Sequence, residues 1–140
     1  VLFRSKGALP KACKKPDRPI AGLVKDPKRL GLLDSTVVHW GGEMGRLPVV
    51  QNTRNAGRDH NTYGFSMWLA GGGFKAGHIH GETDEWGHRC VRDKVNHYDY
   101  HATLLQLFGL DHDHLKYKRG GRVQSLIDGQ PARVLEELLA

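Results

Sequence analysis

Apolar residues fall into separate runs along the chain, and the first run has helical spacing. Asp17 is suited to cap a helix, and the apolar residues Ile20, Leu23 and Val24 follow it at the i, i+3, i+4 spacing of one helix face. Pro27 lacks a backbone donor, so we expect this helix to kink or end nearby. Residues 1–16 mix lysine, proline and glycine without a period, and we expect them to be a poorly ordered lead-in.

Two further runs predict strands. Residues 36–40 (TVVHW) and 65–70 (FSMWLA) are nearly continuous in apolar character, which favours strands buried on both faces. Between them, residues 41–63 form a long, polar, glycine-bearing loop, and loops of this length are usually functional. The order helix, strand, loop, strand predicts an α/β class with a central sheet, occupying residues 17–140.

The second half of the chain carries clearer local signals. The expected elements are irregular strands within 78–96, a helix over 98–108 that stops at Gly109, a hairpin of 116–118 with 123–127 around Gly120-Gly121, and a last short helix from Pro131.

Composition limits the function classes. The 140 residues suffice for one domain with a core, and 39% are hydrophobic. The net charge of +6 admits an anionic partner, but without a recognition helix or an aromatic stacking platform we do not expect nucleic acid. No run approaches the roughly 20 apolar residues of a membrane span, and residues 1–19 do not resemble a signal peptide. Cys13 and Cys90 lack CxxC partners, which excludes a zinc ribbon and argues against a disulfide scaffold.

Both expected strands run directly into glycine-rich turns. GGEMGR occupies residues 41–46 and GGGFKAG occupies residues 71–77, and neither has the spacing of a P-loop or a dinucleotide fingerprint. In open α/β sheets, ligands bind beyond the carboxyl ends of strands, where glycines allow close approach. The alternative is that these glycines only end the strands.

The long loop collects charged residues of complementary chemistry: Glu43, Arg46, Arg54, Arg58, Asp59 and His60. Guanidinium groups suit phosphate and sulfate oxygens because of their planar fork. An adjacent Asp59-His60 pair supplies an oxygen and an imidazole, either as metal ligands or as hydrogen-bonding groups at an ester. The loop therefore predicts a site for an oxyanion ester, and the alternative is a solvated basic loop.

Other histidines form weaker candidates. His97 and His101 are four residues apart at the start of the second helix, as in helical zinc sites, and Asp99 between them could orient an imidazole. The pair lacks the glutamate of HExxH, so a metalloprotease is excluded. The run DHDH at 111–114 favours adventitious metal affinity, and no GxSxG nucleophile is present.

Four motifs in order carry a family resemblance: WGGEMGR, GRDH, FSMWLAGGGFKAG and HYDYHATLLQLFGLDH. Over about residues 10–140 the chain resembles the C-terminal part of a bacterial sulfatase-like family, the domain of unknown function 1501 of the alkaline phosphatase superfamily. The resemblance implies an α/β sandwich around a mostly parallel sheet, incomplete in this chain, with the upstream half and its nucleophile missing.

The resemblance also implies roles for individual residues. GGEMGR stands where sulfatases carry Asp-His-Gly, so Glu43 takes the place of a metal ligand and Arg46 lies near the anion. His60, with Asp59, and His97 are the further expected ligands of a divalent metal such as Ca, Zn or Mg, and His60 and Arg46 are the expected catalytic residues.

The resulting expectation is the C-terminal fragment of a metal-dependent hydrolase, inactive alone, that acts on small-molecule or polysaccharide sulfate or phosphate esters. The alternative is a non-catalytic relative that binds sulfated or phosphorylated polyanions. Relatives often carry an export signal upstream, which implies a periplasmic or secreted protein. An incomplete sheet also predicts an exposed edge, exposed apolar surface and poor solubility.

Overall fold

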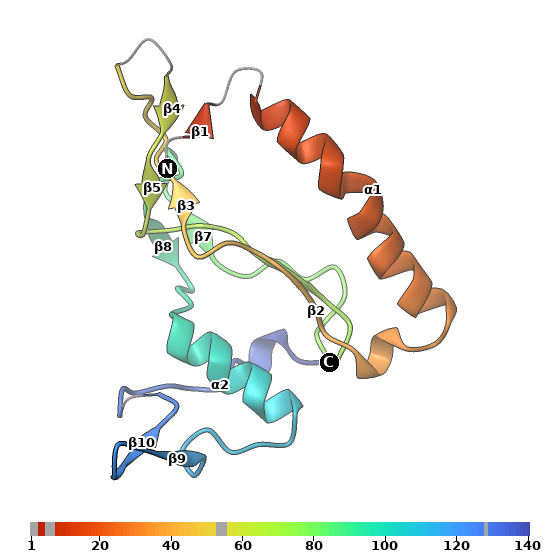
Figure 1. Ribbon diagram of the computed structural model, residues 1–140, viewed down its shortest axis with the longest axis vertical. Helices are drawn as coiled ribbons and strands as arrows, with labels where there is room; N and C mark the ends of the chain where they lie inside the picture. Colours follow the sequence, from red (N-terminus) through yellow and green to blue (C-terminus); the bar gives the residue numbers. More distant parts are fainter. Residues whose placement is uncertain (1–2, 5–7, 53–55, 128) are drawn as a thin grey trace. The chain divides into compact units, whose positions relative to one another are not determined.

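The computed structural model of the chain describes residues 3–4, 8–52, 56–127 and 129–140 (Figure 1). The chain divides into two compact units. The first unit comprises residues 1–72 and 79–94, and the second comprises residues 73–78 and 95–140. No helix among the described residues is long and apolar enough to cross a membrane.

The first unit begins with a long helix, α1 (Ala8–Arg29). It ends two residues after Pro27, as the sequence predicts, but it begins at Ala8, so Asp17 lies inside it and does not cap it. Pro16 and Pro19 also lie inside the helix, and each removes one backbone donor. None of its residues is buried. The short 3-10 helix η1 (Leu33–Ser35) then leads the chain into strand β2 (Val38–Trp40).

The strands of the first unit are short and pair two by two. They are β1 (Phe3–Arg4), β2 (Val38–Trp40), β3 (Gly45–Arg46), β4 (Gly57–Arg58), β5 (His60–Asn61), β6 (Trp68–Ala70), β7 (Glu82–Thr83) and β8 (Cys90–Arg92). β1 pairs with β4, β2 with β6, β3 with β5 and β7 with β8, and every one of these pairs is antiparallel. The β7 and β8 strands lie in the region 78–96, where irregular strands were expected.

The predicted α/β sandwich with a mostly parallel sheet is therefore wrong. A parallel pair needs a crossover connection between its strands. Here the chain leaves β2 through the β3–β5 region and returns as β6 in the opposite direction, with Val38 opposite Ala70 and Trp40 opposite Trp68. No parallel pair occurs within the described residues.

Burial of the two apolar strands also differs from the prediction. In β2 only Val38 is buried, whereas His39 and Trp40 are exposed, and in β6 Trp68 is exposed. The reason is that a two-stranded ribbon has one partner strand and few elements to cover its faces. An apolar run in the sequence specifies side chains that could be buried, but it does not supply the layers that bury them.

The second unit is built on helix α2 (His97–Leu107), which confirms the predicted helix. The Asn96 side chain caps its start by accepting a hydrogen bond from the Asp99 N–H at 2.8 Å. At the other end Gly109 has a φ of 71°, its N–H donates to the Gln106 carbonyl, and the Leu110 N–H donates to the Leu105 carbonyl. This is a Schellman ending, so the predicted stop at Gly109 is confirmed.

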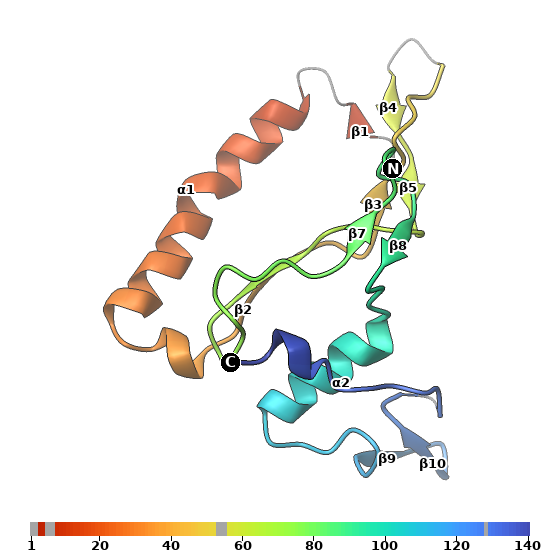
Figure 2. The ribbon, with the colours of Figure 1, turned by 180° about the vertical axis from the view of Figure 1, so that it is seen from behind.

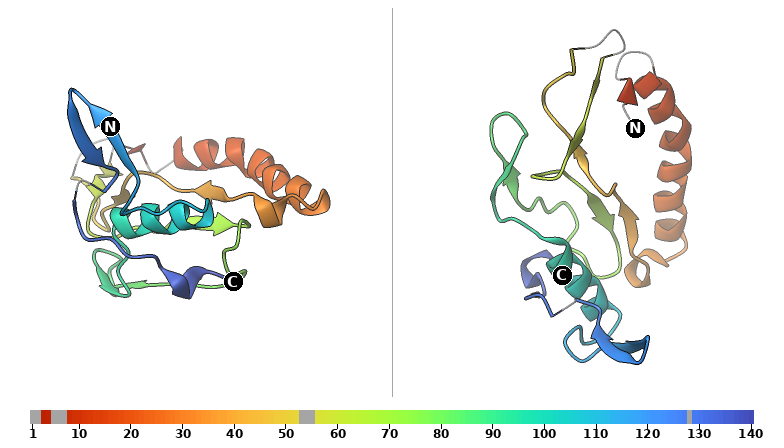
Figure 3. Two further views of the ribbon diagram at one scale, coloured as in Figure 1. Left: turned by 90° about the horizontal axis from the view of Figure 1, so that it is seen from below. Right: turned by 60° about the vertical axis from the view of Figure 1, so that its left-hand side comes forward.

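The predicted hairpin is also confirmed. Strands β9 (Lys116–Arg119) and β10 (Arg122–Ser125) pair in register and form the blue hairpin of Figure 3. Gly120 and Gly121 have φ values of 57° and 78°, the geometry that a two-residue turn requires. The expected last helix is only the 3-10 turn η2 (Glu136–Leu138), which begins later than Pro131.

The core of the second unit is small and partly polar. Ala102 and Leu135 are fully buried, and the Thr103 hydroxyl between them donates to the Asp99 carbonyl at 2.8 Å while it accepts from the Leu135 N–H at 2.9 Å. The Asp99 carboxylate accepts from the Arg133 N–H at 3.0 Å. These hydrogen bonds attach the C-terminal segment around Arg133 and Leu135 to the first turns of α2. The contact of the Asp99 carboxylate with the Arg133 N–H is therefore a structural one.

Candidate functional site

Two motifs singled out in the sequence meet in one antiparallel strand pair of the first unit. β3 carries the end of GGEMGR and β5 carries the end of GRDH, and their register places Arg46 opposite His60 and Gly45 opposite Asn61. The Leu47 N–H donates to the Asp59 carbonyl at 2.8 Å, and the Gln51 N–H donates to the Gly57 carbonyl at 3.0 Å. Part of the expected long loop is therefore a two-stranded antiparallel ribbon. We call residues 43–46 and 58–60 the Arg-His corner.

His60 lies half-buried at the centre of this corner. Its Nδ1 atom lies 3.2 Å from the Met44 sulfur, and its backbone N–H donates to Asp59 Oδ1 at 2.8 Å. Residues directly opposite in an antiparallel pair lie on the same face, so the His60 ring and the Arg46 side chain share one side of the ribbon. The Nδ1 edge of the ring thus faces the Met44 side chain.

The arginines of the corner concentrate positive charge. Arg46 and Arg58 are both half-buried. Arg58 precedes His60 by two residues, the spacing at which side chains of an extended segment lie on the same side. Arg54, the third arginine of the predicted set, lies outside the described residues. Two guanidinium groups and an imidazole therefore belong to one face, a combination suited to an oxyanion.

The acidic members of the predicted site lie at its rim. Glu43 is exposed, and only Met44 separates it from the start of β3. Asp59 is also exposed and lies between β4 and β5. Among the described residues, no three His, Cys, Asp or Glu side chains come together closely enough to hold a metal ion. Glu43, Asp59 and His60 are therefore at most part of a ligand set.

His97 belongs to the other unit. It is the first residue of α2, it is exposed, and its ring lies 3.8 Å from the Tyr98 ring between centroids. His101 is also exposed and makes an edge contact with Tyr100. His97 therefore lies in the second unit, whereas the residues of the Arg-His corner lie in the first.

The DHDH run forms a local pair at the exit of α2. The His114 Nδ1 lies 2.6 Å from Asp111 Oδ2, and both side chains are exposed. The His114 side chain lowers the pKa of Asp111, with the Asp113 N–H as a further cause. This pair shapes a turn, because the Asp111 carboxylate also accepts the Asp113 N–H at 2.8 Å.

Three glycines of the two turns, Gly41, Gly45 and Gly71, lie against other segments of the chain. A Cβ atom at Gly45 would lie 2.7 Å from the Phe65 Cβ, and a Cβ atom at Gly41 would lie 2.8 Å from the Met67 Cγ. In the second turn, Gly71 has a φ of 74° and its missing Cβ would meet the Leu33 carbonyl oxygen. These glycines allow protein segments to pack, which is a sufficient reason for their presence without a ligand.

One residue that supports the corner was not anticipated from the sequence. The Asn61 side chain, 1% exposed, donates to the carbonyls of Gly64 at 3.1 Å and His88 at 2.9 Å, and accepts from the Tyr63 N–H at 3.0 Å. It thereby joins β5 to the loop between β7 and β8, which Figure 2 shows beside it. The available signal was an Asn directly after a candidate site histidine, followed by a Tyr-Gly turn.

The loop between β7 and β8 is itself organised by one carboxylate. Asp84 accepts backbone N–H bonds from His88 at 2.8 Å, Arg89 at 3.0 Å and Trp86 at 3.2 Å. The His88 N–H is the largest of the causes that lower the pKa of Asp84, and partial burial opposes it. Arg89 lies over the Tyr63 ring, 4.8 Å from its centroid, and this contact closes the loop onto the end of β5.

Comparison with known proteins gives a family and no closer relative. A family model described as "Protein of unknown function (DUF1501)" matches residues 4–139. No curated protein and no solved structure matches the chain.

Proposed function

Since the chain belongs to the family described as "Protein of unknown function (DUF1501)", we propose that it is the C-terminal part of a sulfatase-like hydrolase of phosphate or sulfate esters. The register that places Arg46 opposite His60 supports this proposal. It unites a guanidinium group, suited to an ester's charged oxygens, with an imidazole, suited to proton transfer, on one face of a ribbon.

Each basic residue of the Arg-His corner then has a proposed role. Arg46, with Arg58, holds the non-bridging oxygens of the phosphate or sulfate group and neutralises their charge. His60 presents Nε2 to the ester oxygen, because Nδ1 faces the Met44 sulfur. In this position the imidazole donates a hydrogen bond or a proton to the leaving oxygen. The attacking group is not among these residues, so the 140 residues alone are expected to be inactive.

A divalent ion (Ca²⁺, Zn²⁺ or Mg²⁺) belongs to the proposal, but the described residues do not complete its site. Asp59 Oδ1 already accepts the His60 N–H, and within the part of the chain that the structure describes no three His, Cys, Asp or Glu side chains come together. Glu43 and Asp59 would supply oxygen ligands, His60 or His97 would supply nitrogen, and the remaining ligands would come from the missing N-terminal half. We therefore assign no reaction step to the metal.

A second function is favoured by the same charge pattern. Arg46, Arg58 and His60 share one face of the ribbon, a positive surface that suits retention of a sulfated or phosphorylated polyanion. In either case the proposed ligands are small-molecule or polysaccharide esters met outside the cytoplasm, in the periplasm or after secretion.

Binding is tested on the 140-residue chain with immobilised heparin and a salt gradient. We expect Arg46→Ala and His60→Ala to elute at lower salt than the parent chain. Arg119→Ala removes an equal charge from the exposed β9 strand and is the matched control, so it should shift elution less. Equal shifts for Arg46→Ala and Arg119→Ala would show that only net charge matters and would contradict a built site.

Catalysis is tested on the protein extended through its upstream half, with aryl phosphate and aryl sulfate as substrates. The proposal expects turnover that His60→Ala removes, and metal content that falls in Glu43→Ala and His60→Ala. Specific heparin retention without turnover would select the binding function. Turnover that survives both Arg46→Ala and His60→Ala would refute the assigned roles.

A further inference from the structure

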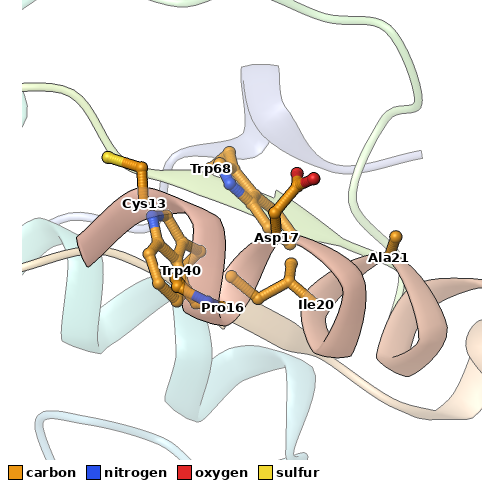
Figure 4. A pocket seen from close by; sticks show the side chains of 7 residues that line it. All are labelled: Cys13, Pro16, Asp17, Ile20, Ala21, Trp40 and Trp68. Atoms are coloured by element: carbon orange, nitrogen blue, oxygen red, sulfur yellow. The ribbon is translucent and has the colours of Figure 1, made fainter. Parts of the chain in front are cut away.

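A pocket of about 350 Å³ lies between α1 and the β2–β6 pair, within the first unit (Figure 4). Its lining comes from one face of the helix and from two cross-strand indoles: Cys13, Pro16, Asp17, Ile20, Ala21, Trp40 and Trp68. The volume is within the range of small-molecule sites, and the pocket does not overlap the Arg-His corner.

The two tryptophans provide an aromatic wall. Trp40 and Trp68 are directly opposite in the β2–β6 register, so their side chains share one face of the ribbon. They remain 46% and 38% exposed, which is unusual for large aromatic side chains that a neighbouring helix could cover. Figure 4 shows both indoles and the side chains of α1 gathered around the same space.

Asp17 is the only charged side chain among the lining residues. It has no hydrogen bond or ion pair within the part of the chain that the structure describes. The other acid of α1, Asp26, differs in this respect, because it lies 3.6 Å from Arg29. The basic residues of α1 occupy other positions of the helix, and none lines the pocket.

An aromatic wall with one unpaired carboxylate is complementary to an organic cation. Indole faces attract ammonium groups through their quadrupole, and a quaternary ammonium also buries its methyl groups against apolar side chains such as Ile20. A neutral ligand of the same shape gains the apolar contact only, and an anion is repelled by Asp17. We propose that this pocket binds small quaternary ammonium compounds.

The probe pair is choline and its neutral isostere 3,3-dimethylbutan-1-ol, titrated into the chain while tryptophan fluorescence is recorded. Trp86 is 72% exposed and lines no part of the pocket, so a Trp86→Phe background leaves Trp40 and Trp68 as the only indoles. We expect a saturable signal with choline and a dissociation constant at least about fivefold larger for the neutral isostere.

Two matched variants test the role of the carboxylate. Asp17→Asn should weaken choline binding by about fivefold or more and bring it to the level of the neutral isostere. Asp26→Asn removes the same charge from the same helix outside the pocket and should leave binding unchanged. Equal binding of choline and its isostere, or equal effects of the two variants, would overturn the proposal.

Cys13 gives a second readout that does not depend on fluorescence. It lines the pocket and is exposed, whereas Cys90 is only partly exposed and lies in β8. In a Cys90→Ser background, choline should slow alkylation of Cys13, and the neutral isostere at equal concentration should slow it less. Alkylation that choline does not affect would place any observed binding elsewhere and overturn the assignment of this pocket.

Discussion

The side-chain amide of Asn61 donates a hydrogen bond of 2.9 Å to the backbone carbonyl of His88, 27 residues further along the chain. Asn61 follows His60 directly, so this bond connects the proposed catalytic histidine to the loop between β7 and β8. The hydrogen bonds of the buried Asn61 amide therefore help to fix the position of the Arg-His corner, in addition to the pairing of its own two-residue strands.

Asn61→Ala should destabilise the chain by about 1–3 kcal/mol, because it leaves the part-buried Gly64 and His88 carbonyls and the Tyr63 N–H without the amide. Asn61→Asp should be at least as destabilising as Asn61→Ala, since an ionised carboxylate cannot donate to the carbonyls of Gly64 and His88. Urea denaturation measures both. Asn52→Ala, at an exposed asparagine, is the control and should change little, and a comparable loss there would contradict a specific role for Asn61.

Gly45 tests why the corner carries glycines. A Cβ atom there would lie 2.7 Å from the Phe65 Cβ and 2.9 Å from the Gly64 carbonyl oxygen, so the two segments would have to separate. Gly45→Ala should destabilise by about 1–3 kcal/mol. A Cβ atom at Gly42, in the same motif, would lie 3.6 Å from the Met44 carbonyl oxygen and near nothing else, so Gly42→Ala should be nearly neutral. Thermal denaturation of both variants measures the difference in stability. If both substitutions were neutral, the glycines would not be required by packing.

The elements predicted correctly are those whose signals are local in the sequence. Gly109 ends α2 and Gly120-Gly121 forms the β9–β10 turn, because helix C-caps and two-residue turns depend on residues a few positions away. The Asn96 cap of α2 is equally local but was not predicted. The direction and burial of the strands at 36–40 and 65–70 depend on distant partners. Their apolar composition fitted a buried parallel sheet equally well, and that prediction was wrong.

The candidate site shows the same division. The sequence singled out GGEMGR and GRDH separately from their residue types, but the register that places Arg46 opposite His60 is a long-range pairing that no motif specifies. Asp99 was considered as a partner of an imidazole, and the structure gives its carboxylate a backbone partner 34 residues away, the Arg133 N–H. Hydrogen-bonding side chains are easy to find in a sequence, but their partners follow from the fold.

Thr103 is the polar centre of the second unit's core. Its hydroxyl connects the Asp99 carbonyl to the Leu135 N–H, and the side chain is 1% exposed. Thr103→Val keeps the shape but leaves the buried Leu135 N–H unpaired, and should destabilise by about 1–3 kcal/mol in urea denaturation. Thr103→Ser retains the hydroxyl and should lose less stability than Thr103→Val. Exposed Thr62→Val is the control, and equal losses at Thr62 and Thr103 would count against the hydroxyl bridge.

Asp84 should give the first unit a dependence of stability on acid pH. Backbone N–H groups, that of His88 first, lower the pKa of Asp84 below its ordinary value of 3.8. Because the folded-state pKa lies below the unfolded one, the carboxylate contributes stability above the unfolded pKa and loses it as pH falls through the folded pKa. Asp84→Asn should therefore be less stable than the parent chain at about pH 7, and the difference should shrink toward about pH 3.

Urea denaturation across this pH range measures the effect, with tryptophan fluorescence recorded in a Trp40→Phe, Trp68→Phe background that leaves Trp86 of the loop as the reporter. Glu85→Gln removes a charge from the exposed neighbouring residue and should shift stability equally little at both ends of the range. If Asp84→Asn and Glu85→Gln gave parallel pH profiles, the three N–H bonds at Asp84 would not be coupled to folding. If the loss of stability relative to the parent chain narrows at acid pH only for Asp84→Asn, protonation of this carboxylate destabilises the loop between β7 and β8, to which Asn61 attaches the strand of His60.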